Sequence, residues 1–220
     1  MKTLKLIVTL VCATLLLTSA QVFGQSRKEK STIVPPVKAD NFKEIADRLS
    51  NDGWKTSAFS IEEQMASTAK LQSETNPSDH GAMYFWVKEE TTASSLSDAM
   101  TANLISAVNN IAYQVEAPFL SQCQLILVNK GATDRLPAMN KIIAQSVPMV
   151  IQSNLRKTME IYREKDKMNT VQTVYMLDKE KIYDMVVIEC SKHAQADKEN
   201  SILIDVFKEA KARMEKRKLR

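Results

Sequence analysis

The side chains that could do acid–base or metal chemistry are few and scattered along this 220-residue chain. The two histidines, His80 and His193, have no histidine or cysteine at the spacing of a metal-binding pair. His80 follows Asp79 in a predicted loop, where the two could exchange protons, although a solvated turn histidine is the simpler interpretation. His193 falls near a predicted helix C-terminus, where it complements the helix dipole. The sequence therefore predicts no metal centre and no histidine-based catalytic site.

Two pairs of adjacent glutamates also fail to form a catalytic carboxylate pair. Glu63 is accounted for by a capping box with Ser60, which leaves Glu62 alone. Glu89 and Glu90 fall on a predicted strand, where adjacent side chains point to opposite faces and cannot act together.

Glycine and serine patterns exclude further reaction classes. Beyond Gly24 the chain has only Gly53, Gly81 and Gly131, too far apart for a phosphate-binding loop or a dinucleotide fingerprint. The sequence has no Gly-x-Ser-x-Gly nucleophile elbow. We therefore expect a protein that is not an enzyme and that has no cofactor or metal.

Cys123 and Cys190 fall on the apolar faces of predicted helices. A nucleophilic role for Cys123 has little support, because no base lies near it in the sequence. Two buried, unpaired thiols and one disulfide both fit, since an exported chain can be oxidised.

The N-terminus is typical of a targeting segment. Lys2 and Lys5 precede an apolar run, residues 6–18, that is short for a membrane span, and Val22-Phe23-Gly24 fits a signal-peptidase site. We expect a signal peptide over residues 1–24, with an uncleaved anchor as the alternative. Cys12 follows Val11 in the middle of the run, which is no lipidation site. The sequence therefore predicts export, to the periplasm or in association with the outer membrane.

Charge sets a limit on partners. The whole chain carries a net charge of +4, and the leader contributes two of those positive charges. The exported part is therefore close to neutral, which argues against a nucleic-acid partner.

Periodicity and cap residues predict the elements that must position these side chains. Residues 25–39, with Pro35-Pro36, are predicted as a flexible tether, residues 40–197 as an α+β domain, and residues 198–220 as a basic amphipathic C-terminal helix. Helices are predicted at residues 41–50, 61–75, 96 to about 128, 137–151, from 178 to about 194, and 202–218; strands are predicted at 54–59, 82–92, 155–163 and 170–178. The fold class is α+β: a single antiparallel sheet of about four strands with helices packed on it.

The helix that begins at Leu96 organises this arrangement. Its apolar side chains fill half of its circumference up to Val115, which calls for a sheet beneath it, and Pro118 should kink or split its continuation. The strand at 82–92 lacks strict alternation, which is typical of a strand covered on both faces.

Several segments resemble the Lpp-twenty-like family of bacterial envelope proteins. They are Asp52-Gly53-Trp54-Lys55, the helix start Ser60-Ile61-Glu62-Glu63-Gln64, the helix end Asn110-Ile111-Ala112-Tyr113-Gln114-Val115, the strand Met159-Glu160-Ile161-Tyr162-Arg163 and the helix entry Tyr175-Met176-Leu177-Asp178. The resemblance covers about residues 52–194. It lies in the order of these segments and their general residue pattern rather than in catalytic signatures.

That resemblance implies a fold similar to flagellar and envelope assembly proteins, with no established enzymatic activity. Family members are often lipoproteins or associated with the outer membrane. This chain departs from the family in lacking a lipidation cysteine and in having no glycine at the strand-to-helix joint, residues 88–92.

The last predicted helix has an apolar stripe bordered by cations. The stripe comprises Leu203, Val206, Phe207, Ala210 and Met214, and the bordering cations include Lys211, Arg213 and Arg217. The helix could dock on its own domain, pack on a partner or on itself, or lie on an anionic membrane surface without spanning it.

The function predicted from the sequence is that of a non-enzymatic exported envelope protein. It would act through contact with other envelope proteins or through self-association. The alternative is a small-ligand or cell-wall-glycan binding module that uses Trp54, Trp86 or Tyr84, although the sequence identifies no small molecule.

Overall fold

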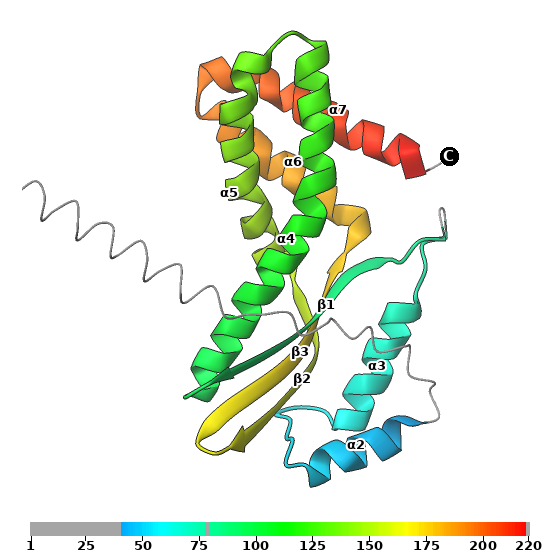
Figure 1. The fold of residues 1–220 in the computed structure, drawn as a ribbon. Helices are drawn as coiled ribbons and strands as arrows, with labels where there is room; N and C mark the ends of the chain where they lie inside the picture. The colour runs from blue at the N-terminus through cyan, green and yellow to red at the C-terminus, as the bar shows by residue number, and fades with distance from the viewer. Residues whose placement is uncertain (1–40, 78–79, 219–220) are drawn as a thin grey trace, which may run out of the picture. The chain divides into compact units, whose positions relative to one another are not determined.

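The order of helices and strands follows the predicted order closely (Figure 1). The computed structural model describes residues 41–77 and 80–218, so the predicted signal peptide and tether lie outside the described residues. The elements are α2 (Phe42–Asn51), α3 (Ile61–Ser73), β1 (Tyr84–Ala93), α4 (Leu96–Asn129), α5 (Leu136–Asn154), β2 (Arg156–Lys165), β3 (Met168–Asp178), α6 (Lys179–Gln195) and α7 (Ser201–Lys218). The described residues all belong to the unit Val37–Arg220. The α+β class is confirmed.

Within residues 41–77 and 80–218, the sheet has three antiparallel strands in the order β1-β3-β2. The expected fourth strand at residues 54–59 is reduced to one bridge, between Lys55 and Tyr162 at the outer side of β2. Trp54 turns into the core and the chain bends at residues 57–59, so only one residue runs alongside β2. The prediction of about four strands was therefore one strand too many.

β3, rather than β1, is the strand covered on both faces. Val174 and Met176 belong to the core beneath α3, and Leu177 belongs to the core among the long helices. β1 alternates between half-buried and exposed from Phe85 onward, so the expectation that both its faces are covered is wrong. The reason is its position at the sheet edge, because α3 packs mainly against β2 on the far side of the sheet.

α4 joins the sheet to the helical part of the molecule. Ser95 Oγ accepts a hydrogen bond from the backbone N–H of Asp98 at 3.1 Å and so caps the helix. One half of α4 lies on β1 and β3, and the other half packs on α5 and α7. The helix runs on through Pro118 to Asn129, so it is not split there.

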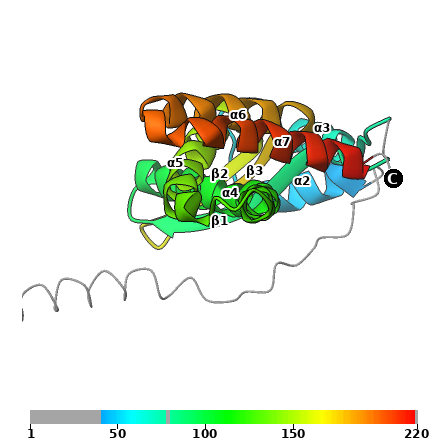
Figure 2. The ribbon, with the colours of Figure 1, turned by 90° about the horizontal axis from the view of Figure 1, so that it is seen from above.

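The four long helices form two antiparallel pairs. Seen from above, α6 and α7 run side by side across α4 and α5, which appear nearly end-on (Figure 2). Their shared core contains Phe119, whose ring centroid lies 6.1 Å from that of Phe207 and 6.3 Å from that of Tyr183. Within the described part of the chain, no helix combines the length and hydropathy needed to cross a membrane.

Two local predictions are confirmed, the capping box of α3 and the hairpin of β2 and β3, although the turn of the hairpin is shorter than the predicted segment 164–169. The capping box forms at α3, where Ser60 Oγ accepts from the Glu63 N–H and the Glu63 carboxylate accepts from the Ser60 N–H. The hairpin between β2 and β3 turns on Asp166 and Lys167, which both have positive φ, at 54° and 63°. Positive φ at both central residues is the geometry of a type I′ turn, which matches the twist of the strands.

Candidate functional site

The apolar stripe of α7 lies inside the protein's own core. Leu203, Val206, Phe207 and Ala210 are fully buried, and Met214 packs against the same cluster at its margin. These side chains hold α7 against α4 and α6 and are not an exposed surface in this conformation. Of the alternatives predicted for this helix, the structure therefore shows the apolar stripe docked on its own domain. Only the outer side of α7 is left for contact with a partner in this conformation.

Two of the described cations on α7, Lys211 and Arg213, are paired with carboxylates. Lys211 bonds to Asp184 of α6 and lies 3.2 Å from Glu215, and Arg213 lies 2.7 Å from Glu209. Hydrogen bonds from Lys130 and Arg213 lower the pKa of Glu209, and the bond to Asp184 raises the pKa of Lys211. The side chain of Arg217 lies outside the described residues. This pairing weakens the interpretation of α7 as a polyanion-binding helix.

Among the described residues, the histidines and thiols are not brought into a reactive arrangement; Asp79, the predicted partner of His80, lies outside them. His80 is exposed in a loop, and His193 Nε2 lies 3.6 Å from Glu189 of its own helix. Cys123 and Cys190 are both free and buried, which matches the unpaired alternative. Burial raises the pKa of Cys123 strongly and that of Cys190 to about 12, so both stay protonated and unreactive at neutral pH. Among the described residues, no three metal-ligating side chains gather.

The structure confirms the prediction that the side chains of Glu89 and Glu90 lie on opposite faces of β1. Glu89 accepts from Ser106 Oγ at 2.7 Å and from Asn110 Nδ2 at 2.6 Å, both on α4. Glu90 accepts from Gln172 on the other face of the sheet. Glu89 therefore fastens α4 to β1 through both of its carboxylate oxygens. Glu160 lies across β3 on the same face, since both glutamates are paired with Thr173, and its carboxylate is bound by Lys157.

A cavity of about 410 Å³ opens where β1, α4, α6 and α7 meet. The Lys179 ammonium lies 4.9 Å from the ring centroid of Phe85, and burial raises the pKa of Tyr183 to about 12. The described lining contains no carboxylate, histidine or cysteine; it consists of Phe85, Pro118, Ser121, Gln122, Lys179, Tyr183 and Met214. The cavity could hold a small amphipathic molecule but offers no acid–base pair for a reaction.

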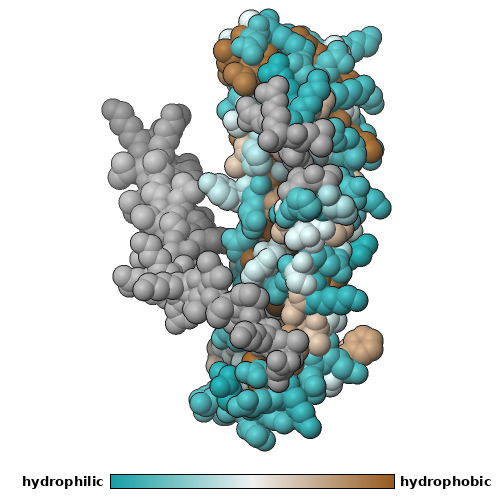
Figure 3. Space-filling view, turned by 90° about the vertical axis from the view of Figure 1, so that its right-hand side faces the viewer, coloured by the Kyte–Doolittle hydropathy of each residue, from teal (hydrophilic) through white to brown (hydrophobic). Residues whose placement is uncertain are grey.

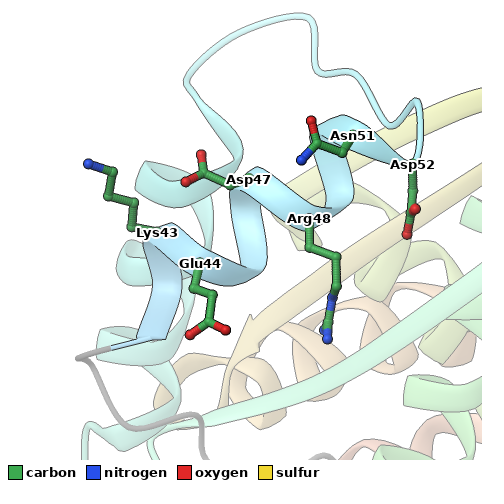
Figure 4. Close-up of a pocket in the computed structure, with 6 residues that line it drawn as sticks. All are labelled: Lys43, Glu44, Asp47, Arg48, Asn51 and Asp52. Carbon is green, nitrogen blue, oxygen red and sulfur yellow. The ribbon is translucent and has the colours of Figure 1, made fainter.

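A second hollow lies on the outer side of α2 and has different chemistry (Figure 4). Charged and amide side chains of α2 and of the residue that follows it line the hollow: Lys43, Glu44, Asp47, Arg48, Asn51 and Asp52. They spread away from one another along the helix, with both signs of charge interspersed. Such a solvated helix face is no site by itself.

The aromatic residues named for a glycan site separate in the structure. Trp54 is only 6% exposed and lies beneath the Arg163 guanidinium, whose carbon is 4.7 Å from the ring centroid. Tyr84 donates a hydrogen bond to Glu74 at 3.2 Å. Trp86 is 40% exposed on the outer face of β1. Of the three, only Trp86 presents a broad ring surface to solvent.

The two edges of the sheet differ in their protection. At β2, Gln64 Oε1 accepts from the Glu160 N–H at 2.7 Å, while Lys55 exchanges two backbone hydrogen bonds with Tyr162, at 2.8 and 2.9 Å. Along β1, the described part of the chain places no such partner on the side away from β3. β1 therefore has a ten-residue edge of backbone donors and acceptors open to another strand.

Exposed aromatic rings flank this open edge. Trp86 lies on one face of β1. On the other face, Ser106 and Asn110 of α4 reach Glu89, and Tyr113 follows them on the same side of the helix at 77% exposure. The face of the molecule that lies on the right in Figure 1 is mainly hydrophilic and has small, separate hydrophobic patches (Figure 3). We take the β1 edge, with Trp86 and Tyr113, as the candidate site and call it the β1 edge surface.

Sequence reasoning missed the β1 edge surface because it depends on strand order. The sequence identified the strand and its aromatic residues, but the position of β1 at the edge follows from which strand pairs with β3. The sequence of this strand has no strict alternation of apolar and polar residues, so it held no clear signal of an edge strand. The exposure of every second residue from Trp86 to Thr92 appears only in the structure.

No family model, curated protein or solved structure matches this chain.

Proposed function

We propose that this protein is a non-enzymatic, exported envelope protein that acts by contact with other envelope proteins or with copies of itself. The observation that carries the proposal is the ten-residue edge of β1, along which the described residues supply no backbone partner, in contrast to the capped edge of β2. Long open edges are usually blocked in soluble proteins, because they recruit other strands. A retained open edge favours a role in binding a strand of another chain.

The placement of the polar side chains supports the non-enzymatic part of the proposal. Glu89 is held by α4, Glu160 lies 2.7 Å from Lys157, and both thiols are buried. Acid–base catalysis needs a proton donor or acceptor within reach of a bound substrate. The described lining of the cavity contains no carboxylate, histidine or cysteine.

The envelope location in the proposal rests on the sequence. The charged start, the short apolar run and the Val22-Phe23-Gly24 site are typical of an export signal. The resemblance to Lpp-twenty-like envelope proteins points to the same compartment.

Crosslinking of the full chain in intact cells tests the contact role. A membrane-permeant amine crosslinker should give discrete adducts of this chain, and Trp86→Ser with Tyr113→Ser should reduce them. Phe59→Ser is the matched control, because Phe59 is 71% exposed on a different segment and its loss should leave the adducts unchanged. A chain that stays free of adducts at every crosslinker concentration would overturn the proposal.

Small-ligand binding is a second candidate function, favoured by the cavity of about 410 Å³. A volume of this size lies within the usual range for ligand sites, and the largely apolar walls suit a small amphipathic molecule. An anionic naphthalene dye should become fluorescent on binding the protein, and Ser121→Phe should abolish this by filling the cavity. Equal fluorescence from both proteins would rule this site out.

A further inference from the structure

We propose that the β1 edge surface binds the same surface of a second copy, with the two β1 strands antiparallel and Glu89 of each chain at the two-fold axis. This inference rests on the proposed function and names its partner. Pairing would join the two three-stranded sheets into one continuous sheet. Such an interface is isologous, because each chain contributes the same residues.

Backbone hydrogen bonding provides the first argument. In an antiparallel ladder, alternate residues of an edge strand direct their N–H and C=O groups away from the sheet. On β2 these outward groups are satisfied at Glu160 by Gln64 and at Tyr162 by Lys55. On β1 the described residues supply no such hydrogen-bond partners, whereas a second β1 strand would supply partners for all of the outward N–H and C=O groups.

Charge provides the second argument. Lys88 and Glu90 are both exposed and lie on the same face of β1, because they are two residues apart. With Glu89 at the axis, Lys88 of each chain lies directly opposite Glu90 of the other. The interface then contains two symmetric ion pairs, and opposite charges directly across a strand pair attract.

The neighbouring registers lack this match. A two-fold axis at Lys88 would place each Lys88 opposite its copy, and an axis at Glu90 would do the same for Glu90, so like charges would repel. In the Glu89 register the two Glu89 residues are also opposite each other. Their carboxylates, however, are turned toward α4 by hydrogen bonds from Ser106 and Asn110.

The remaining side chains along the edge fit a paired strand. Trp86 of each chain would lie opposite Thr92 of the other on the face that carries the ion pairs. On the other face, Tyr113 extends from α4 on the side of the helix that contacts β1. A second strand beside β1 would cover part of both exposed rings, and aromatic side chains of this kind are enriched in protein interfaces.

Charge reversal tests the pairing and its register together. Lys88→Glu places carboxylates opposite each other twice, and Glu90→Lys does the same with ammonium groups. Each single variant should raise the dimer dissociation constant by roughly tenfold or more, from two cross-strand pairs changed from attraction to repulsion. The double variant, Lys88→Glu with Glu90→Lys, restores both ion pairs and should return to near the wild-type constant.

The decisive sample is a mixture of the two single variants, each of which is mainly monomeric alone. In a mixed pair, the carboxylate introduced by Lys88→Glu lies opposite the ammonium introduced by Glu90→Lys, and the remaining native Lys88 and Glu90 lie opposite each other. Both cross-strand pairs are then attractive, so the mixture should form a heterodimer. Sedimentation velocity measures this, and circular dichroism checks that each variant is folded. Lys141→Glu on α5 is the matched control, since it makes the same charge change at an exposed site away from the sheet.

Three results would overturn the inference. Wild-type protein that is monomeric up to near-millimolar concentration would exclude self-pairing, and the edge would then be covered by a segment of its own chain or by another protein. A double variant as weak as the single variants would exclude the Glu89 register. A dimer that is unaffected by any change in β1 would place the contact elsewhere. In the first case, adducts to other proteins in cells would leave the proposed contact function standing.

Discussion

Truncation of Phe207 to alanine tests whether α7 is part of the core. Phe207 is fully buried, and its ring stacks on that of Phe119 with centroids 6.1 Å apart. Removing a buried phenylalanine side chain costs about 3–5 kcal/mol, because transfer energy is lost and a cavity remains. For a domain of this size we expect the melting temperature to fall by about 6–20 °C.

Urea and thermal unfolding followed by circular dichroism measure this effect. Lys208→Ala is the matched control, since Lys208 is exposed on the same helix next to Phe207, and it should change stability by less than about 0.5 kcal/mol. If Phe207→Ala shifts unfolding no more than Lys208→Ala, α7 does not dock as described. Its apolar stripe would then be available to a partner.

Three further results are expected. Lys167→Gly should raise the free energy of unfolding in urea by about 0.5 kcal/mol, because Lys167 has a φ of 63° that glycine adopts without strain. The larger conformational entropy that glycine loses on folding offsets part of this gain. Cys123 and Cys190 should not react with an aromatic disulfide reagent in the native state, and both should react in denaturant, since both are buried. Burial raises the pKa of Tyr183 from 10.0 to about 12, so the free energy of unfolding should fall as pH rises through that interval. The fall should be smaller in Tyr183→Phe, and equal losses in both proteins would contradict the burial of this hydroxyl.

Local sequence signals predicted most of the fold. The cap at Ser60, the cap at Ser95 and the turn-like charged segment of the hairpin set element boundaries close to those observed. These signals act through neighbouring residues, so they can be recognised without knowing the tertiary structure. The class and the order of elements followed from them.

Features that depend on long-range pairing were predicted less well. The segment after Trp54 was expected to form a strand, but it forms one bridge because Trp54 is drawn into the core. The assignment of β1 as a fully covered strand failed because burial depends on strand order, which places β3 in the centre.

The candidate site was only partly predictable for the same reason. The stripe on α7 is amphipathic whether it covers its own domain or a partner, and only the packing of Phe207 against Phe119 distinguishes the two. Trp86 was one of three aromatic residues predicted for a glycan or small-ligand site, but its exposure and the open strand edge beside it appear only once the sheet is assembled. The sequence does not show which edge strand keeps its backbone N–H and C=O groups unpaired.

The most direct test of contact through the β1 edge is a photo-activated crosslinking residue at position 92 of the full chain in living cells. Thr92 is exposed on β1, outside the proposed ion pairs, and would lie opposite Trp86 of a second copy; Lys141 on α5 is the control position. Pairing of β1 with a second copy predicts an adduct of twice the chain mass from position 92 and none from position 141. No adduct from position 92, or equal adducts from both positions, would contradict it.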